Sequence, residues 1–280
     1  MFRNKYPKIF EIIKKDFKLN EEKCEIIVNN CINKIKEKIK KDNLKSLVVG
    51  ISGGLDSAVI ASICQQKNTG IPLIGISIPI SSSKDHREKA KWVGNNFCSS
   101  FDEFLGFDNF NEKESKNLFD SIFKSIEDTN KIAEKVGFKV ENFPKNILNG
   151  NIKARLRMIV LYDMARKTNG LVMSTDNYSE YLMGFWTING DVGDFGLIQN
   201  IYKGLELPYI AKYLGIREDI IEQKPSDGLM ITDNDTDEAQ LGSNYEDIDC
   251  IMIIKEKYPE FYGKIENDEI VKKIIKRYYD

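Results

Sequence analysis

An apolar strand, a glycine turn and a helix follow one another without a gap, and this feature constrains the fold most. The strand is predicted over 46–51, the turn over Ser52–Ser57 and the helix over 57–67. The adjacent glycines Gly53 and Gly54 let backbone N–H groups approach an anion, and the helix directs the positive end of its dipole to the same point. The segment therefore predicts a phosphate-binding turn at the carboxyl end of a buried strand.

The turn differs from the Walker phosphate loop because no Lys-Ser or Lys-Thr pair follows its glycines. Ser52 and Ser57 can instead hydrogen-bond phosphate oxygens, and Asp56 can bind magnesium, which prefers oxygen ligands. The stretch Ser52–Ala58 resembles the pyrophosphate-binding loop of the ATP pyrophosphatase (PP-loop) superfamily, whose members activate a carboxylate or carbonyl oxygen with AMP and release pyrophosphate. The alternative is an ordinary strand-to-helix turn in which Ser57 is only a helix N-cap.

The composition indicates a folded globular protein without a charge bias. Its 280 residues, 41% of them hydrophobic, suffice for one large domain or two small ones. Lys and Arg total 41 against 43 Asp and Glu, so the net charge of -2 favours neither nucleic acid nor an anionic membrane as partner. No apolar run of about 18 residues is present to span a bilayer, and residues 1–20 have no secretory pattern. We therefore predict a cytoplasmic protein.

The cysteines and the single histidine suggest no metal site. The five cysteines form no C-x-x-C pair and lie mostly in apolar runs, which predicts reduced core residues. One histidine cannot form a zinc site without cysteine partners, or a serine triad without a fitting nucleophile. His86 lies in the polar stretch Ser81–Arg87 and is interpreted as a solvated loop residue, although that loop could close over a nucleotide.

Helices and strands alternate along the chain, which predicts right-handed crossovers and a parallel sheet. The fold class is α/β, a doubly wound parallel sheet with helices on both faces. Ligands in such sheets bind at the carboxyl ends of the strands, where the turn after 46–51 lies. Residues 223–244, rich in small polar side chains, are predicted to form a mobile flap. Further predicted elements are helices over 21–41, 85–97, near 112–137, 151–167 and 178–186, a strand over 73–78 and a strand-to-loop junction over 171–177.

Nearly the whole chain resembles the ammonia-dependent NAD synthetases of the PP-loop superfamily, which have the adenine nucleotide alpha hydrolase-like fold. The resemblance implies one synthetase domain over 1–280, without a glutaminase domain. The first block of residues below marks only the superfamily, whereas all four together mark the family. The blocks are Gly50–Ser57; Gly150–Met158; Ser174–Asn177 with Glu180, Gly184, Thr187, Gly190, Asp191 and Asp194; and Lys224–Ser226 followed by Thr236–Glu238 and Leu241–Gly242.

The resemblance implies an ATP site, a magnesium site and a substrate site. Asp56 and Lys203 would be the catalytic groups, with Lys203 restoring the lysine that the loop lacks, and Asp56 and Glu180 would hold magnesium. Arg155 and Asp194 would contact the substrate. Asp194 matches the substrate-binding aspartate of the family only if the comparison deletes one residue within Gly190–Asp194. The ATP-binding positions would be Gly50, Ile51, Ser52, Gly53, Gly54, Leu55, Asp56, Ser57, Thr175, Lys203 and Ser226.

Each of these residues also has a plain structural interpretation. Glu180 follows Asn177 by three positions and could complete a capping box at a helix start, and Thr175 could be an N-cap. Lys203 and Ser226 could be solvated surface residues. Arg155 could belong to an exposed helical face.

Two features depart from the family pattern, and both concern the substrate. Ile188 stands where the family has a lysine after Phe185–Thr187. A His-Lys pair near the family's C-terminus has no counterpart in the tail Lys276–Asp280. Each lost charge-assisted contact would cost about 1.5 to 3 kcal/mol. Either other groups offset this loss, or the protein amidates a different acid.

The resemblance implies a two-step ligase reaction. The nicotinate carboxylate of deamido-NAD attacks ATP to give an acyl adenylate and pyrophosphate, and ammonia then displaces AMP to form NAD. The family also implies a homodimer with the 151–167 helix near its interface. Three alternatives stay open: the same chemistry on another acid such as nicotinate mononucleotide, a relative that adenylates tRNA, and a non-catalytic ATP-binding relative.

Overall fold

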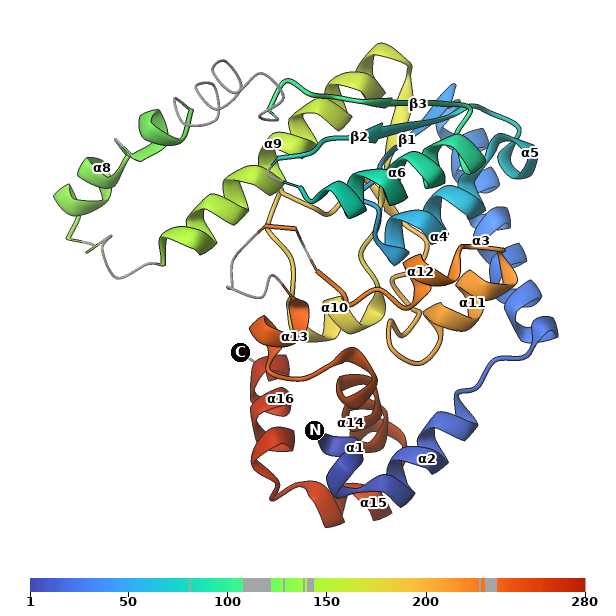
Figure 1. The fold of residues 1–280 in the computed structure, drawn as a ribbon, viewed down its shortest axis with the longest axis vertical. Coiled ribbons are helices and arrows are strands. Elements are labelled where there is room, and N and C mark those ends of the chain that lie inside the picture. The colour runs from blue at the N-terminus through green and yellow to red at the C-terminus, as the bar shows by residue number, and fades with distance from the viewer. Residues whose placement is uncertain are drawn as a thin grey trace.

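The computed structural model describes residues 1–80, 82–107, 122–127, 129–137, 139, 144–226, 228–229 and 236–279. Within these ranges, helices surround one parallel sheet (Figure 1). No helix of the described part is both long enough and apolar enough to cross a bilayer.

The sheet has five strands in the order β3-β2-β1-β4-β5, and all neighbouring strands run parallel. Because β1 pairs with β2 on one side and with β4 on the other, the winding direction reverses at β1. This confirms the predicted doubly wound α/β fold and places the binding crevice beside β1 and β4. The strands are β1 (Ser46–Gly50), β2 (Leu73–Ser77), β3 (Ser100–Glu103), β4 (Gly170–Ser174) and β5 (Phe195–Gly196).

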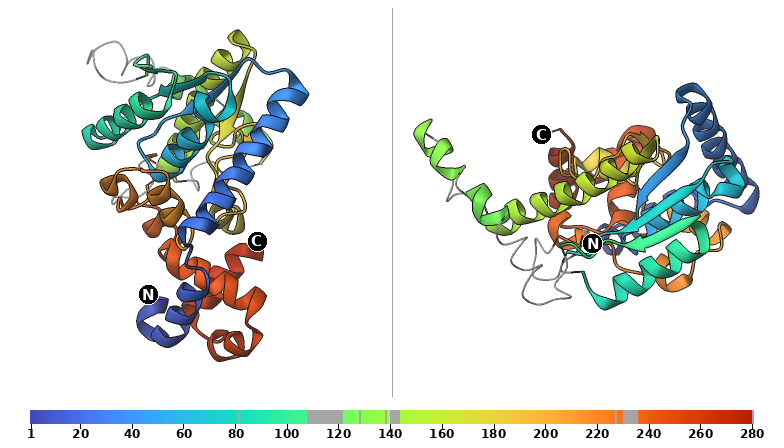
Figure 2. Two further views of the ribbon diagram at one scale, coloured as in Figure 1. Left: turned by 90° about the vertical axis from the view of Figure 1, so that its right-hand side faces the viewer. Right: turned by 90° about the horizontal axis from the view of Figure 1, so that it is seen from above.

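Alternation along β1 explains why both faces of the sheet are covered. Successive side chains of a strand point to opposite faces. Leu47 and Val49 are buried in the core that contains α3 and α4, whereas Val48 is buried with Met158 and Leu161 of α9. Figures 1 and 2 show α9 on one face of the sheet and α3, α4 and α6 on the other.

A second core unites the two ends of the chain. Helices α1, α2, α14, α15 and α16 pack around buried residues that include Phe2, Ile248 and Ile251. Figure 1 shows this helical part beside α10 and α13, and both termini lie there. The sequence alone gave no prediction for this part of the fold.

The helices have the following bounds. They are α1 (Phe2–Lys5), α2 (Pro7–Asp16), α3 (Glu21–Asp42), α4 (Leu55–Cys64), α5 (Gln66–Thr69), α6 (Lys84–Phe97), α8 (Asn130–Lys135), α9 (Lys145–Lys167), α10 (Tyr178–Met183), α11 (Leu207–Tyr213), α12 (Glu218–Ile221), α13 (Asp237–Leu241), α14 (Tyr245–Lys257), α15 (Pro259–Ile265) and α16 (Glu269–Tyr279).

Several predicted boundaries differ from the structure for local reasons. Helix α9 begins at Lys145 rather than 151, directly after Pro144, which cannot be an interior helix residue. Helix α10 ends at Met183 rather than Trp186 because Gly184 adopts a left-handed conformation with φ 57°. The predicted helix 57–67 begins earlier, at Leu55, and is divided into α4 and α5 at Gln65.

Two predicted segments are described only in part. Helix α8 lies in the region predicted as helical near 112–137, but residues 108–121 and 128 are outside the described residues. Figure 2 shows α8 projecting away from the sheet. Of the predicted flap, residues 227 and 230–235 are outside the described residues, and the part that follows them contains helix α13.

Candidate functional site

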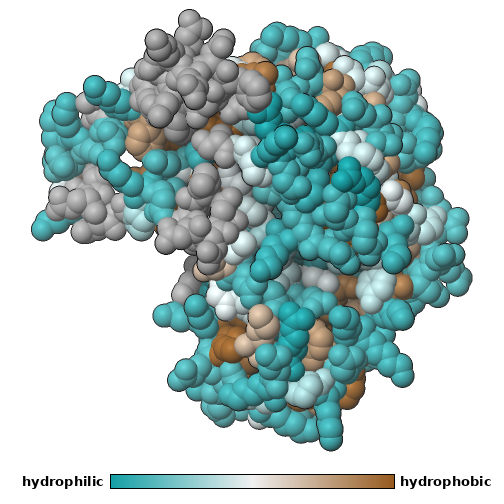
Figure 3. All heavy atoms as spheres, in the orientation of Figure 1, coloured by the Kyte–Doolittle hydropathy of each residue, from teal (hydrophilic) through white to brown (hydrophobic). Residues whose placement is uncertain are grey.

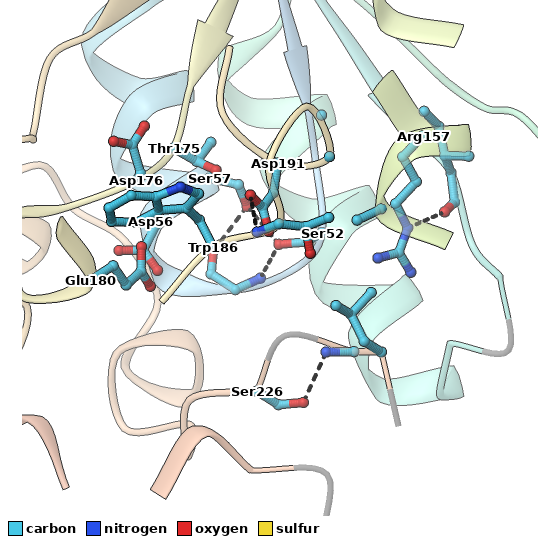
Figure 4. A pocket seen from close by; sticks show the side chains of 18 of the residues that line it. Ser52, Asp56, Ser57, Arg157, Thr175, Asp176, Glu180, Trp186, Asp191 and Ser226 are labelled. Carbon is cyan, nitrogen blue, oxygen red and sulfur yellow. Dashed lines mark hydrogen bonds between the residues drawn. The ribbon is translucent and has the colours of Figure 1, made fainter. Parts of the chain in front are cut away.

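A cavity of about 490 Å³ opens at the carboxyl ends of β1, β2 and β4. Its walls include Gly50 and Ile51 at the end of β1, Ser77 and Ile78 at the end of β2, and Thr175 after β4. This volume lies in the range of small-molecule and cofactor sites. Figure 4 shows Asp56 and Glu180 on one side of the cavity, Arg157 on the opposite side and Ser226 at its edge.

The glycine turn forms the part of the cavity wall between β1 and α4. Gly53 has φ 86°, a left-handed conformation that favours glycine, and an added Cβ would overlap the carbonyl oxygen of His86 in α6. Gly53 is therefore required both by its backbone conformation and by the close packing of α6 against the turn.

The turn leaves backbone donors available for an anion. The N-cap of α4 is Gly54, which has no side chain to cap the helix. The N–H groups of Leu55, Asp56 and Ser57 have no acceptor among the described residues, as is usual in the first turn of a helix. These donors, with the positive end of the α4 dipole, form a site suited to phosphate.

The loop hydroxyls are already ordered by each other. Ser52 Oγ and Ser57 Oγ lie 3.1 Å apart and share a hydrogen bond. Ser57 Oγ also donates to the carbonyl of Gly54 at 3.0 Å, and the N–H of Gly54 donates to Ser52 Oγ at 3.1 Å. These hydrogen bonds give the turn a defined shape.

A buried lysine lies among carboxylates beside this turn. Lys203 is only 8% exposed. Its Nζ atom lies 2.7 Å from Glu180 Oε1, 3.1 Å from Asp56 Oδ2 and 3.5 Å from Asp237 Oδ2. The Nζ atom also lies 4.5 Å from the centre of the Tyr245 ring. The interpretation of Lys203 as a solvated surface residue is therefore wrong.

Burial and mutual charge change the acidity of this cluster. Burial raises the pKa of Glu180 to about 8, an effect that Lys203 opposes and the neighbouring Asp56 strengthens. The surrounding carboxylates outweigh desolvation and hold the pKa of Lys203 well above its ordinary value, so the lysine stays charged. A permanent cation therefore lies beside the phosphate-binding turn.

Asn177 connects the acidic groups to the start of α10. Its Oδ1 accepts from the N–H of Glu180 at 3.0 Å, and Glu180 Oε2 accepts from the N–H of Asn177 at 3.3 Å. This is the capping box that the spacing suggested, and Glu180 forms it with one oxygen while the other meets Lys203. Asn177 Nδ2 also donates to Asp56 Oδ1 at 2.9 Å, which fixes the carboxylate.

Most of the predicted ATP positions line the cavity. Thr175 lies there and is not an N-cap, because Asn177 has that role in α10. Gly53 and Leu55 belong to the turn but do not line the cavity. The predicted residues that do line it are Gly50, Ile51, Ser52, Gly54, Asp56, Ser57, Thr175, Glu180, Lys203 and Ser226.

The two predicted substrate residues lie outside the cavity. Arg155 is exposed on α9, and its Nε donates to the carbonyl of Ile188 at 3.2 Å. Asp194 is also exposed and accepts from the Tyr162 hydroxyl at 2.9 Å and the Val172 N–H at 3.1 Å. Within one copy of the chain, neither side chain meets the phosphate-binding turn.

Several cavity residues were missed by sequence reasoning. Asp237 and Asp191 lay in the family blocks without an assigned role. Arg157 lies two positions after Arg155 in the same block, and spacing alone did not show which arginine faces inward. Arg277 was passed over with the C-terminal tail, yet it lines the cavity and donates to the carbonyls of Met183 at 3.3 Å and Gln240 at 3.2 Å.

The interpretation of His86 as a solvated loop residue is wrong. Ser83 caps α6, so the polar stretch becomes the first turn of a helix, and the N–H of His86 donates to Ser83 Oγ at 3.2 Å. His86 is half-buried, lines the cavity, and its ring contacts Gln223.

The prediction for the cysteines is confirmed in its main point. All five are described and free; Cys24, Cys31, Cys64 and Cys250 are buried, and Cys98 is half-buried. None of them lines the cavity.

Comparisons with known proteins agree with this geometry. The NAD synthase family model matches residues 27–279. An NH₃-dependent NAD⁺ synthetase from Methanococcus aeolicus is 34% identical over 239 residues, which cover 85% of each chain. A solved NH₃-dependent NAD synthetase from Campylobacter jejuni is 25% identical and superimposes with a TM-score of 0.68, covering 93% of this chain and 94% of the other.

A solved NMN synthetase from Francisella tularensis shares the fold, with a TM-score of 0.70 at 22% identity and 94% of both chains covered. The family match spans the turn, the carboxylates, the lysine and the cavity described above. The chain belongs to the NAD synthase family.

Proposed function

We propose that the protein is an ATP-dependent ligase that amidates the nicotinate carboxylate of deamido-NAD with ammonia, giving NAD, AMP and pyrophosphate. The observation that carries this proposal is the buried Lys203 between Asp56 and Glu180, beside the unpaired N–H groups at the start of α4. The names of the relatives support ammonia as the nitrogen donor.

In this reaction the protein positions ATP and neutralises charge. The N–H groups of Leu55–Ser57 and the hydroxyl groups of Ser52 and Ser57 bind the phosphates that leave as pyrophosphate. Lys203 contributes a fixed positive charge where negative charge develops on the leaving group. The substrate carboxylate attacks the α-phosphorus, and ammonia then attacks the acyl carbon so that AMP leaves.

The carboxylates of Asp56 and Glu180 fit a magnesium ion and are the groups that would hold it. Asp56 and Glu180 each direct one carboxylate oxygen to Lys203 Nζ, so the two carboxylates lie on the same side of the cavity. No group of three or more His, Cys, Asp and Glu suited to a metal occurs among the described residues. When bound, magnesium would supply charge neutralisation at the phosphates.

The protein supplies no covalent nucleophile in this scheme. The five cysteines lie away from the cavity, and burial raises the pKa of Cys98 to about 12, so this thiol is not activated. AMP is itself the leaving group, and catalysis by positioning suffices.

Cations in the cavity wall can bind the acidic substrate. Arg157 lines the cavity, with its Nε donating to the carbonyl of Ile78 at 3.2 Å. Arg277 of α16 is held by carbonyl groups and makes no ion pair with a carboxylate of the described residues. We propose that these guanidinium groups offset the lysine that Ile188 replaces.

We further propose a homodimer through the outer face of α9. Arg155, Ile159 and Tyr162 recur at helical spacing on this face, and Ile159 is 62% exposed. Asp194 joins them through its bond with Tyr162. A second copy on this face would bring both predicted substrate residues, Arg155 and Asp194, into an enclosed interface.

The dimer is tested by sedimentation velocity of Ile159→Asp against Ile26→Asp. Ile26 is a matched control because it is 54% exposed on α3. We expect Ile159→Asp to be monomeric and Ile26→Asp to remain dimeric. A monomeric wild type with full activity would refute the dimer.

The compartment is also a proposal. The five cysteines are free, as is usual in the reducing cytoplasm, and this supports a cytoplasmic protein.

A substrate panel tests the function. ATP, magnesium and ammonium are incubated with deamido-NAD, nicotinate mononucleotide or nicotinate, and AMP and pyrophosphate are measured. We expect equal amounts of both products with deamido-NAD. Faster turnover of nicotinate mononucleotide would mean that this acid is the substrate and that the chemistry is the same. ATP binding without turnover of any acid would indicate a non-catalytic relative.

A further inference from the structure

We propose that Asp249 of α14 is a positioning residue that fixes the Lys203–Glu180 pair from behind the cavity. This inference rests on the proposed function, because that function gives the pair its task. Asp249 does not line the cavity and belongs to none of the sequence blocks that marked the site.

Asp249 is a fully buried carboxylate, 0% exposed, whose partners are all neutral donors. Its Oδ1 accepts from Ser179 Oγ at 2.6 Å, and its Oδ2 accepts from the N–H of Gly204 at 2.7 Å. The N–H of Leu205 also donates to this carboxylate. No ion pair of Asp249 with a lysine or arginine occurs in the described part of the chain.

These partners are the chain neighbours of the two charged cavity residues. Ser179 directly precedes Glu180, and Gly204 directly follows Lys203. Ser179 Oγ in turn accepts from the N–H of Lys203 at 2.8 Å. One carboxylate therefore connects the backbone of the lysine with the first turn of the helix that carries the glutamate.

The close packing of Gly204 against α14 leaves little freedom for the backbone next to Lys203. An added Cβ at Gly204 would overlap the backbone of Glu246 in the first turn of α14. The same turn of α14 supplies Tyr245, whose ring lies 4.5 Å from Lys203 Nζ and whose hydroxyl donates to Asp237 at 2.9 Å. Helix α14 thus holds Lys203 at both its backbone and its ammonium group.

A purely structural role could be filled by a neutral polar residue of the same size, without the cost of a buried charge. A buried charge without a cationic partner is costly, even when it is hydrogen-bonded. Burial raises the pKa of Asp249 to about 7, and its hydrogen bonds offset only part of the effect. What a carboxylate provides here is the ability to accept all of these N–H and O–H bonds at once.

The test compares Asp249→Asn with Asp247→Asn. Asp247 is a matched control because it is also 0% exposed on α14 and accepts from a backbone N–H, that of Phe2 at 2.8 Å, but it faces the N-terminal helix instead of the cavity. Each variant is combined with Lys203→Met. The ATP dissociation constant is measured by calorimetry, and the rate of AMP formation by chromatography.

We expect Asp249→Asn to lower kcat by about 10- to 100-fold, since a displacement of about 1 Å is costly in catalysis, and to weaken ATP binding. Asp247→Asn should change kcat less than about threefold even if it lowers thermal stability similarly. In the Lys203→Met background, Asp249→Asn should have no further effect on ATP binding, because residues that act through one another are not additive. The same fold-change in both backgrounds would overturn the proposal.

A second variant covers the case in which Asp249→Asn does not fold. Ser179→Ala removes only the link between Asp249 and the N–H of Lys203, and it should lower kcat by about tenfold. An unchanged kcat in Ser179→Ala would also overturn the proposal. Turnover of deamido-NAD by the wild type is measured in parallel and tests the proposed function. ATP binding tests the role of Asp249 even if deamido-NAD is not turned over.

Discussion

The Nζ atom of Lys203 lies 2.7 Å from Oε1 of Glu180, so the cation of the candidate site is paired with a carboxylate. The lysine follows β5, the glutamate lies in the first turn of α10, and Asp56 of the glycine turn completes the arrangement at 3.1 Å. In the proposed reaction, phosphate contacts would replace part of this pairing, so that one lysine would serve both the carboxylates and the phosphates.

Replacing Lys203 by Met should lower kcat/KM for AMP formation by about 10²- to 10³-fold, the usual effect of removing one donor aimed at developing charge. The variant should also be less stable, because Glu180 and Asp56 lose their cation. Lys203→Arg is the control that keeps the charge, and it should recover only part of the activity because a planar fork differs from an ammonium group. Activity of Lys203→Met within threefold of the wild type would contradict the role.

Replacing Asp56 by Asn should abolish conversion of ATP to AMP and pyrophosphate. The amide is nearly the same shape and can keep a hydrogen bond to Asn177, so the turn should retain its fold. The lost charge should raise the magnesium concentration needed for ATP binding. Circular dichroism checks the fold and a magnesium titration checks the metal, and an unchanged rate would refute the assignment of Asp56.

Replacing Gly53 by Ala should lower both stability and ATP affinity. The residue has φ 86°, and the new Cβ would overlap the carbonyl oxygen of His86. Gly70→Ala is the matched control, since Gly70 has φ 84° but no atom within 4 Å of an added Cβ. Gly70→Ala should lose only about 1 kcal/mol of unfolding free energy, from backbone strain. Both variants are measured by denaturant unfolding, and equal losses would show that packing of Gly53 against α6 is unimportant.

The raised pKa of Asp249 predicts a pH dependence of stability. In the folded state this pKa is about 7, against an ordinary value of 3.8, so the folded state binds more protons between these values. Its contribution to the unfolding free energy is therefore largest below about pH 4 and is lost as pH rises towards about 7. Asp249→Asn lacks this titration, so its stability relative to the wild type should improve from about pH 5 to about pH 8 in urea unfolding. A constant difference would show that Asp249 does not titrate in this range.

The sequence was sufficient for the part of the fold that depends on local patterns. Apolar strands separated by helices predicted the doubly wound sheet, because the apolar run over 46–51 and the glycine turn after it are visible in the residues themselves. Strand β3 was missed since it is only four residues long and mixes exposed with half-buried side chains. The C-terminal helices were not assigned because their core is completed by Phe2 and Phe10 from the other end of the chain.

The candidate site also contains residues that the sequence could predict and residues that it could not. Most predicted positions of the glycine turn line the cavity, whereas Arg277 and Asp249 lie outside the blocks and reach the site or its back only through tertiary packing. No spacing along the chain predicts that Arg277 of α16 meets the end of α10, or that Asp249 lies behind Lys203. Arg155 and Asp194 remain predictions that depend on a second copy of the chain.

The most direct measurement follows oxygen from the substrate carboxylate into AMP. Deamido-NAD labelled with ¹⁸O in its nicotinate carboxylate is incubated with ATP, magnesium and ammonium, and the products are examined by mass spectrometry. Attack on the α-phosphorus predicts AMP that carries one ¹⁸O atom, together with unlabelled pyrophosphate. Unlabelled AMP, or formation of ADP and phosphate instead, would contradict the adenylate mechanism.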